Sequence, residues 1–297
     1  MSPMAPGDSA PDEHRDVRAP CASRAPERRG PARATARTLL DRVAEGFREF
    51  GPEPVAARAD TDTNADTGGG TGGQTAGRTA VEQVDGPLGW PGYDRARARA
   101  RERTGEDESV VCGTGRIGGS ETVLLCFEFD YLGGSLGERT GDRIETAHRR
   151  ARHLRLPVVT LVATGGSRMQ EGMRALIQLQ RVARQTALTR AAGLPQLAVV
   201  RDPATGGGWA TLAAGADVVL GLPGAQAAFA GSRVRPRDAD PAAYTAEGQH
   251  AAGHLDGLVP EPALAPVLAH WLALLTGGDP DAVRDGAAPP PAPVPAA

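Results

Sequence analysis

PVVTLVATGGSRMQEG, residues 157–172, contains a continuous apolar run that ends in two glycines and leads into a helix-forming segment. An apolar run of this length is typical of a strand that is buried on both faces. The following helix is expected to occupy residues 170–192 and to end at Gly193, because glycine is the usual residue after a helix C-terminus. The stretch therefore predicts a strand, a tight turn and a helix in succession.

The same alternation of strand and helix patterns continues on both sides of this stretch. The expected elements are a hairpin of residues 108–117 and 122–129, a helix at 138–154, a strand at 197–200, a glycine-rich turn, a short helix from Trp209 and a strand at 218–220. Strands that alternate with helices at this spacing predict an α/β protein with crossover connections.

The alternating region has the size of one compact domain, which we place at residues 85–278. Residues 35–59 are expected to form an amphipathic helix segment, because apolar residues recur at helical spacing from Leu39 to Phe50. The remaining segments lack periodic apolar residues. They are predicted to be a disordered arm at 1–34, a Gly/Thr-rich linker at 60–84 and a disordered Pro/Ala tail at 279–297.

Composition excludes several classes of function. The chain has 33 basic and 36 acidic residues, for a net charge of -3, and it has no dense basic stripe, so nucleic acid is not an expected partner. All the basic residues are arginines, which excludes lysine Schiff bases and a phosphate-loop lysine. The three cysteines have no metal-ligand spacing, and we expect no bound metal. Without an apolar leader or a membrane-length apolar run, the prediction is a cytoplasmic protein with no membrane partner.

Two crossovers share one chemical feature, a pair of glycines directly after a strand. The pairs are Gly165–Gly166 and Gly206–Gly207. Glycine allows a ligand to approach the backbone closely, and two converging N–H groups can stabilise a developing oxyanion. The alternative is that each pair is only a packing device, which is common after strands. No GxGxxG or GxxxxGK[ST] motif accompanies them, so dinucleotide and nucleoside triphosphate binding are not expected.

Four motifs in order carry a family resemblance. They are FEFDYLGGSLG at 127–137, ATGGSRMQEG at 163–172, RDPATGG at 201–207 and FAGSRV at 229–234, flanked by PLGWPGY at 87–93 and GHLDGLV at 253–259. In order and spacing they resemble the β subunit of bacterial acetyl-CoA carboxylase carboxyltransferase. The resemblance extends from about Pro87 to Leu275.

This resemblance implies a crotonase-like (ClpP/crotonase) β-β-α spiral that binds an acyl thioester such as an acyl-CoA. It implies that Gly206 and Gly207 hold the thioester oxygen of an enolate, with Gly165 and Gly166 as the facing turn. The residues expected to contact substrate are Ser167, Arg168, Met169, Gly208 and Trp209.

The implied function is transfer of CO2 from carboxybiotin to an acyl thioester, in fatty-acid or polyketide precursor supply. It requires an α-type carboxyltransferase subunit, a biotin carboxyl carrier protein that delivers carboxybiotin, and an acyl-CoA or acyl-carrier protein, with no covalently bound cofactor. Two alternatives stay open. One is a biotin-independent decarboxylase of malonyl-CoA or a malonyl-carrier protein, and the other is a non-catalytic acyl-CoA-binding partner subunit.

The chain departs from the family pattern in ways that leave the acyl substrate open. The family's N-terminal zinc ribbon is missing, Ser167 replaces the usual alanine, and Ala204 replaces a threonine.

Three further side chains are given structural interpretations. Glu171 is expected to pair with Arg168, three residues earlier. His148 lies among arginines, which indicates a solvated helix face, and Cys126 lies in an apolar strand as an inert thiol.

Overall fold

The computed structural model describes residues 33–51, 85–229, 231, 236 and 238–278. All the elements described below belong to the unit that begins at Ala34. The predicted linker at 60–84, the tail at 279–297 and all but the last two residues of the predicted arm at 1–34 lie outside the described residues.

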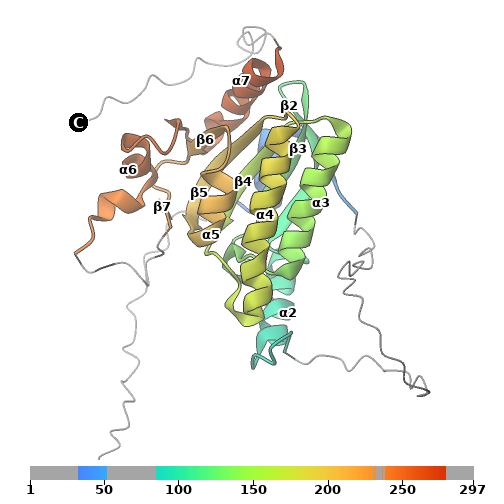
Figure 1. Cartoon of the computed structure of the whole chain (residues 1–297), viewed down its shortest axis with the longest axis vertical. Coiled ribbons are helices and arrows are strands. Elements are labelled where there is room, and N and C mark those ends of the chain that lie inside the picture. Colours follow the sequence, from blue (N-terminus) through green and yellow to red (C-terminus); the bar gives the residue numbers. More distant parts are fainter. Residues whose placement is uncertain (1–32, 52–84, 230, 232–235, 237, 279–297) are drawn as a thin grey trace, which may run out of the picture. The chain divides into compact units, whose positions relative to one another are not determined.

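A mixed sheet of eight strands forms the centre of this unit (Figure 1). The strands are β1 (Glu45–Glu49), β2 (Val110–Ile117), β3 (Ser120–Phe127), β4 (Val158–Thr164), β5 (Gln196–Thr205), β6 (Val218–Gly221), β7 (Ala227–Ala228) and β8 (Gly257–Leu258). They pair in the order β1-β2-β3-β4-β5-β6-β8, with β7 attached to β5. The pairs β1/β2 and β2/β3 are antiparallel, and all the pairs from β3 onward are parallel. The predicted hairpin and crossover connections are confirmed.

The helices cover the two faces of the sheet. The α-helices are α1 (Ala36–Val43), α2 (Tyr93–Thr104), α3 (Glu138–Leu154), α4 (Met173–Ala191), α5 (Gly206–Gly208), α6 (Ala246–Ala251) and α7 (Leu264–Thr276). Short 3₁₀ turns lie at Leu132–Gly134, Met169–Glu171, Pro241–Tyr244 and Glu261–Ala263, and a π-helix at Trp209–Ala213 follows α5 directly.

None of the helices in the described residues combines the length and apolar content that crossing a bilayer requires.

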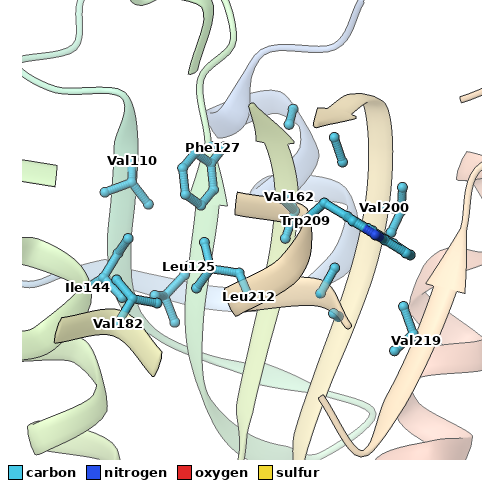
Figure 2. Packing of buried hydrophobic residues seen from close by; sticks show 14 of the residues in the cluster. Val110, Leu125, Phe127, Ile144, Val162, Val182, Val200, Trp209, Leu212 and Val219 are labelled. Carbon is cyan, nitrogen blue, oxygen red and sulfur yellow. The ribbon is translucent and has the colours of Figure 1, made fainter. Parts of the chain in front are cut away.

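The parallel strands are buried on both faces, as the apolar run at 157–163 predicts. In β3, Leu125 and Phe127 point into a core under α3 and α4, whereas Leu124 and Cys126 point into a second core under α1 and α7. This split follows from the two-residue side-chain period of a strand. Figure 2 shows the first core, and in Figure 1 α3 and α4 run side by side across that face. Each fully buried aliphatic side chain stabilises the fold by roughly 1.5–3 kcal/mol.

The amphipathic helix predicted within residues 35–59 is confirmed only for its first part. Helix α1 ends at Val43, Ala44 is extended, and Glu45–Glu49 forms edge strand β1. Gly46 has a φ of 61°, which no helix interior adopts. Pairing with β2 then supplies hydrogen bonds that a continued helix would have made internally.

Two further boundaries differ from the sequence prediction. The expected helix at 170–192 begins as a 3₁₀ turn and becomes helix α4 only at Met173, because Gly172 has a φ of 53° and a ψ of -129°. The expected strand at 197–200 continues to Thr205, because residues near its end pair with both β4 and β7. The second glycine turn therefore starts at Gly206.

His148 is buried, not solvated as predicted, with a side chain only 1% exposed between α3 and α4. Its Nδ1 lies 3.0 Å from Thr189 Oγ1, which also accepts a hydrogen bond from Arg152 at 2.9 Å. Burial, with the nearby positive charge of Arg152, lowers the pKa of His148 to about 4. The neutral imidazole is therefore the folded form.

The depressed pKa of His148 predicts a loss of stability in mild acid. In the unfolded chain His148 titrates near pH 6.5, so its contribution is complete above that pH and is lost as pH falls toward 4. The free energy of unfolding should fall by about 2 kcal/mol between pH 7 and pH 4.5. Urea denaturation of wild type and His148→Gln at pH 7 and pH 4.5 measures it. An equal loss in both proteins would contradict the assignment to His148.

Candidate active site

The two glycine turns lie together at one edge of the sheet. Strands β4 and β5 are parallel neighbours, so the turns that follow Thr164 and Thr205 emerge side by side at their carboxyl ends. A Cβ added to Gly206 would lie 3.3 Å from the Cα of Gly166, which places the two backbones in contact. Both glycines have positive φ, 102° at Gly166 and 67° at Gly206. The predicted convergence of the two turns is present.

Three of the four predicted N–H donors are already used within the chain. The N–H of Gly165 donates to the carbonyl of Gly133 at 2.8 Å, and that of Gly166 donates to Thr164 Oγ1 at 3.0 Å. The N–H of Gly206 donates to the carbonyl of Phe229 at 3.0 Å. These hydrogen bonds hold the turns in shape, and the role of the three N–H groups at an oxyanion stays a prediction.

The groups left for a ligand lie one residue further along each turn. Within the described part of the chain, no hydrogen bond uses the N–H of Gly207, Gly208 or Ser167. In the parallel bridge beside Leu136, the carbonyl of Gly166 and the N–H of Arg168 face Leu136, so the N–H of Ser167 points away from it. Free N–H groups at two touching turns can bind a carbonyl oxygen that acquires negative charge.

Close packing keeps the second turn free of side chains. A Cβ on Gly207 would come within 2.4 Å of both terminal carbons of Leu179, and one on Gly208 within 2.3 Å of Thr164 Cγ2. Both contacts are shorter than a carbon–carbon contact allows, so a larger residue at either position would require the Leu179 or Thr164 side chain to move.

The residues predicted to contact substrate differ in how exposed they are. Ser167 is partly exposed and Met169 is 69% exposed, so both remain open to a ligand, while Gly208 is buried in its turn. Trp209 is only 8% exposed and packs in the core, where Figure 2 draws it with its neighbours. Trp209 therefore has a packing role, and its contact with substrate stays a prediction.

Arg168 also differs from its prediction, because its guanidinium is 1% exposed and faces inward. Its two terminal nitrogens bind both carboxylate oxygens of Glu108, at 2.5 and 3.1 Å, and one of them lies 3.2 Å from Glu171. Tyr93 donates a hydrogen bond to the same oxygen of Glu171. The predicted pair of Arg168 with Glu171 is confirmed, and substrate contact by the Arg168 side chain is not.

The buried ion pair fixes the first glycine turn. The backbone N–H of Arg168 donates to the carbonyl of Leu136, and the N–H of Leu136 donates to the carbonyl of Gly166, each at 2.9 Å. A Cβ on Gly137 would fall 2.6 Å from both Arg168 Nη1 and Glu171 Oε1. The side-chain cluster therefore ties residues 134–137 to the turn at 165–168.

Glu108 was missed by the sequence analysis. The sequence feature that could have indicated a buried ion pair was an acidic residue just before a buried strand. Burial alone raises the pKa of Glu108, but the hydrogen bonds and charge of Arg168 outweigh it and hold that pKa below its usual range. Glu108 is therefore ionised in the folded protein.

Two solved structures share the fold of this chain. The chain superposes on a Pseudomonas malonate decarboxylase hetero-tetramer in complex with malonate with a TM-score of 0.57, covering 81% of this chain and 82% of that chain at 20% identity. It superposes on transcarboxylase 12S with a TM-score of 0.59, covering 80% of this chain and 41% of that chain at 20% identity. The fold is the crotonase-like fold that the resemblance implied.

Sequence comparison gives the family. A family model described as "Carboxyl transferase domain" matches residues 90–254. The acetyl-coenzyme A carboxylase carboxyl transferase subunit beta 2 of Lachnospira eligens is 36% identical over 197 residues, covering 65% of this chain and 77% of the relative. The chain belongs to the carboxyl transferase domain family, with acetyl-CoA carboxylase carboxyl transferase β subunits as relatives.

Other relatives are much longer than the matched region. The acetyl-coenzyme A carboxylase carboxyl transferase subunits beta/alpha of Salinispora tropica is 40% identical over 190 residues, covering 63% of this chain and 34% of the relative. The chain thus spans about a third of the length of such relatives.

The buried pair predicts a large and specific stability loss. Arg168→Met leaves the carboxylate of Glu108 buried without a counter-charge, and should lower the free energy of unfolding by about 3–5 kcal/mol. The matched control, Arg174→Met, removes an exposed arginine that lies 3.5 Å from Glu138 and should cost less than about 1 kcal/mol. Guanidinium chloride unfolding at pH 7 measures both.

The double variant Arg168→Met/Glu108→Leu separates loss of charge pairing from loss of packing. Removing both charges should recover the part of the lost stability that comes from the unpaired carboxylate of Glu108, because apolar replacements of a buried ion pair are often neutral. Glu171 still lacks its arginine partner in both variants, so equal losses would show that packing or Glu171, and not Glu108, carries the effect.

Proposed function

We propose that this chain is the β-type carboxyltransferase subunit of an acyl-CoA carboxylase and that it transfers CO2 from carboxybiotin to an acyl thioester. The observation that carries the proposal is the pair of free N–H groups at the partly exposed Ser167 and Gly207, on two turns in contact. Membership of the carboxyl transferase domain family supports the same activity.

The reaction requires a carbanion next to a thioester carbonyl. When the bond between the CO2 carbon and the biotin nitrogen breaks, that nitrogen would take up the α-proton of the thioester. The negative charge would then develop on the carbonyl oxygen, where the N–H groups of the second turn would stabilise it as an enolate. The α-carbon of the enolate would then form the bond to the released CO2. Carboxybiotin supplies the CO2, and this chain's residues bind the acyl thioester and stabilise its enolate.

We further propose an acyl-CoA, with acetyl-CoA as the first candidate, as substrate, an α-type carboxyltransferase half as partner and a biotin carboxyl carrier protein as CO2 donor. The relatives whose names combine "subunits beta/alpha" support the α-type partner. We propose a cytoplasmic location because Cys112 and Cys126 are unpaired buried thiols.

The assay incubates the chain and an α-type carboxyltransferase subunit with malonyl-CoA, with and without free biotin, and follows the CoA thioesters by mass spectrometry. The proposed function predicts that malonyl-CoA loses its carboxylate only when biotin is present, as the reverse half-reaction. Release of acetyl-CoA without biotin would instead establish a decarboxylase, and no turnover in either case would favour a non-catalytic binding subunit.

The contact between the turns predicts a second result. Gly206→Ala places a methyl group 3.3 Å from the Cα of Gly166 and strains a backbone with a φ of 67°, so the turns must separate. We expect kcat to fall by about 10²-fold or more, the usual effect of losing one oxyanion donor.

Gly119→Ala is the matched control, because Gly119 has a φ of 83° in the β2/β3 turn and nothing lies within 4 Å of its added Cβ. Both variants carry a left-handed strain of about 1–2 kcal/mol. A similar loss of kcat in both would show that general destabilisation, and not the geometry of the turns, lowers activity.

A further inference from the structure

The first glycine turn alternates between exposed and buried residues. Gly165 and Met169 are exposed and Ser167 is partly exposed, whereas Gly166 and Arg168 are buried. A period of two residues is typical of extended backbone, in which successive side chains point to opposite sides. Because the side chain of Arg168 is buried on the inner side of the turn, that of Ser167 lies on the outer side.

The hydroxyl of Ser167 is free. No partner for its Oγ lies among the residues that the structure describes, and its backbone N–H is free as well. The hydroxyls of the neighbouring residues Thr164, Ser135 and Thr205 all take part in hydrogen bonds. A serine hydroxyl can donate one hydrogen bond and accept two. Ser167 therefore offers a ligand two unused donors, one N–H and one O–H.

The second turn presents its own free N–H close to Ser167. The two turns touch at Gly166 and Gly206, where a Cβ on Gly206 would lie 3.3 Å from the Cα of Gly166. Ser167 and Gly207 are the next residues along the two turns, and both are partly exposed. Consecutive Cα atoms are only about 3.8 Å apart. One small ligand with two acceptor groups can therefore reach both turns.

The thioester that the proposed reaction forms has two such acceptor groups. Carboxylation of the α-carbon places a carboxylate on the carbon next to the thioester carbonyl. In the proposed function the N–H of Gly207 serves the carbonyl oxygen, which leaves the N–H and O–H of Ser167 for the carboxylate. Hydrogen bonds to an ionised acceptor are stronger than those between neutral groups. An uncarboxylated acyl thioester has no acceptor at this position.

The acidic side chains nearest the turn are paired with arginines. Glu108 and Glu171 bind the buried guanidinium of Arg168, and Glu138 lies 3.5 Å from Arg174. A ligand carboxylate on the outer side of the turn therefore meets no unpaired negative charge from these three residues.

We propose that the hydroxyl of Ser167 binds the carboxylate of a carboxylated acyl thioester, such as malonyl-CoA, while the second turn holds the thioester carbonyl. Ser167 then determines specificity, because it favours the carboxylated thioester over the uncarboxylated one. This inference rests on the proposed function, which supplies the thioester, and adds the group that recognises its carboxylate. Serine supplies a donor that the alanine usual at this position in the family pattern lacks.

The test compares the binding of malonyl-CoA and acetyl-CoA, which differ only in the carboxylate. Isothermal titration calorimetry without biotin uses the full chain mixed with the α-type carboxyltransferase subunit. The measured quantity is the Kd of acetyl-CoA divided by the Kd of malonyl-CoA. Ser167→Ala should lower this ratio about 10-fold or more, the effect of losing a hydrogen bond to a charged group. An unchanged ratio, including an equal rise of both Kd values, would overturn the proposal.

Two further variants separate the hydrogen bond from other effects. Ser167→Cys keeps a side chain of similar size but has only a weak donor, so the ratio should fall as in Ser167→Ala. A wild-type ratio in Ser167→Cys would assign the effect to shape and contradict the proposal.

Ser120→Ala is the matched control. Ser120 is also partly exposed, and it begins β3, which is parallel to β4, so it lies at the sheet edge opposite the glycine turns. This variant should leave the ratio within about twofold of wild type. A fall as large as that in Ser167→Ala would show that the effect is not specific to the first turn.

The outcomes separate this inference from the proposed function. Biotin-dependent loss of the malonyl-CoA carboxylate, with an unchanged ratio in Ser167→Ala, would overturn the carboxylate contact and leave the function standing. A lowered ratio in Ser167→Ala without any turnover by wild type would support the contact and overturn the function. A wild-type ratio near one would overturn the contact directly, because the protein would not recognise the carboxylate.

Discussion

The parallel pairing of β4 with β5 is the constraint on which the candidate site depends. Five consecutive residue pairs, from Val158 with Gln196 to Val162 with Val200, set the register, and a shift follows before Thr164 meets Ala204. This register brings the turns after the two strands to the same edge, in backbone contact. Side chains on β4 alternate between two cores, so a slip by one residue would move each apolar set into the other core and disrupt the packing of both. The core that stabilises the protein therefore also fixes the distance between the glycine turns.

The buried ion pair of Arg168 and Glu108 completes the first turn. A charged pair in the interior is a weak source of stability, because desolvation offsets most of the attraction. Its value here is geometric, since a bidentate contact defines both the distance and the orientation of the two groups. The backbone of Arg168 is held to Leu136 while its side chain is held to Glu108, and the turn is fixed from both sides. Free N–H groups can then keep their positions without a ligand, which is the preorganisation that oxyanion stabilisation needs.

Apolar spacing along the sequence predicted many of the helices and strands around the site. It failed where contacts with residues distant in the sequence determine secondary structure or burial. Helix α3 has the predicted bounds, because its apolar periodicity is local. Strand β1 was predicted as a helix, because its hydrogen-bond partners are in β2, far along the sequence. His148 was predicted to be exposed from its arginine neighbours, but the packing of α4 across α3 buries it. Among the site residues, the glycine pairs were found from sequence, whereas Glu108 depends on a contact across 60 positions.

By itself, the sequence determined the alternation of strands and helices, the two glycine turns and the carboxyltransferase resemblance, since each is a matter of residue type and short-range spacing. The tertiary structure decided which N–H groups in those turns are free. The N–H groups of Gly165, Gly166 and Gly206 are occupied because carbonyl and hydroxyl acceptors from Gly133, Thr164 and Phe229 bind them. Whether a backbone donor is free depends on which acceptors the fold brings within 3 Å of it, and no local pattern records that.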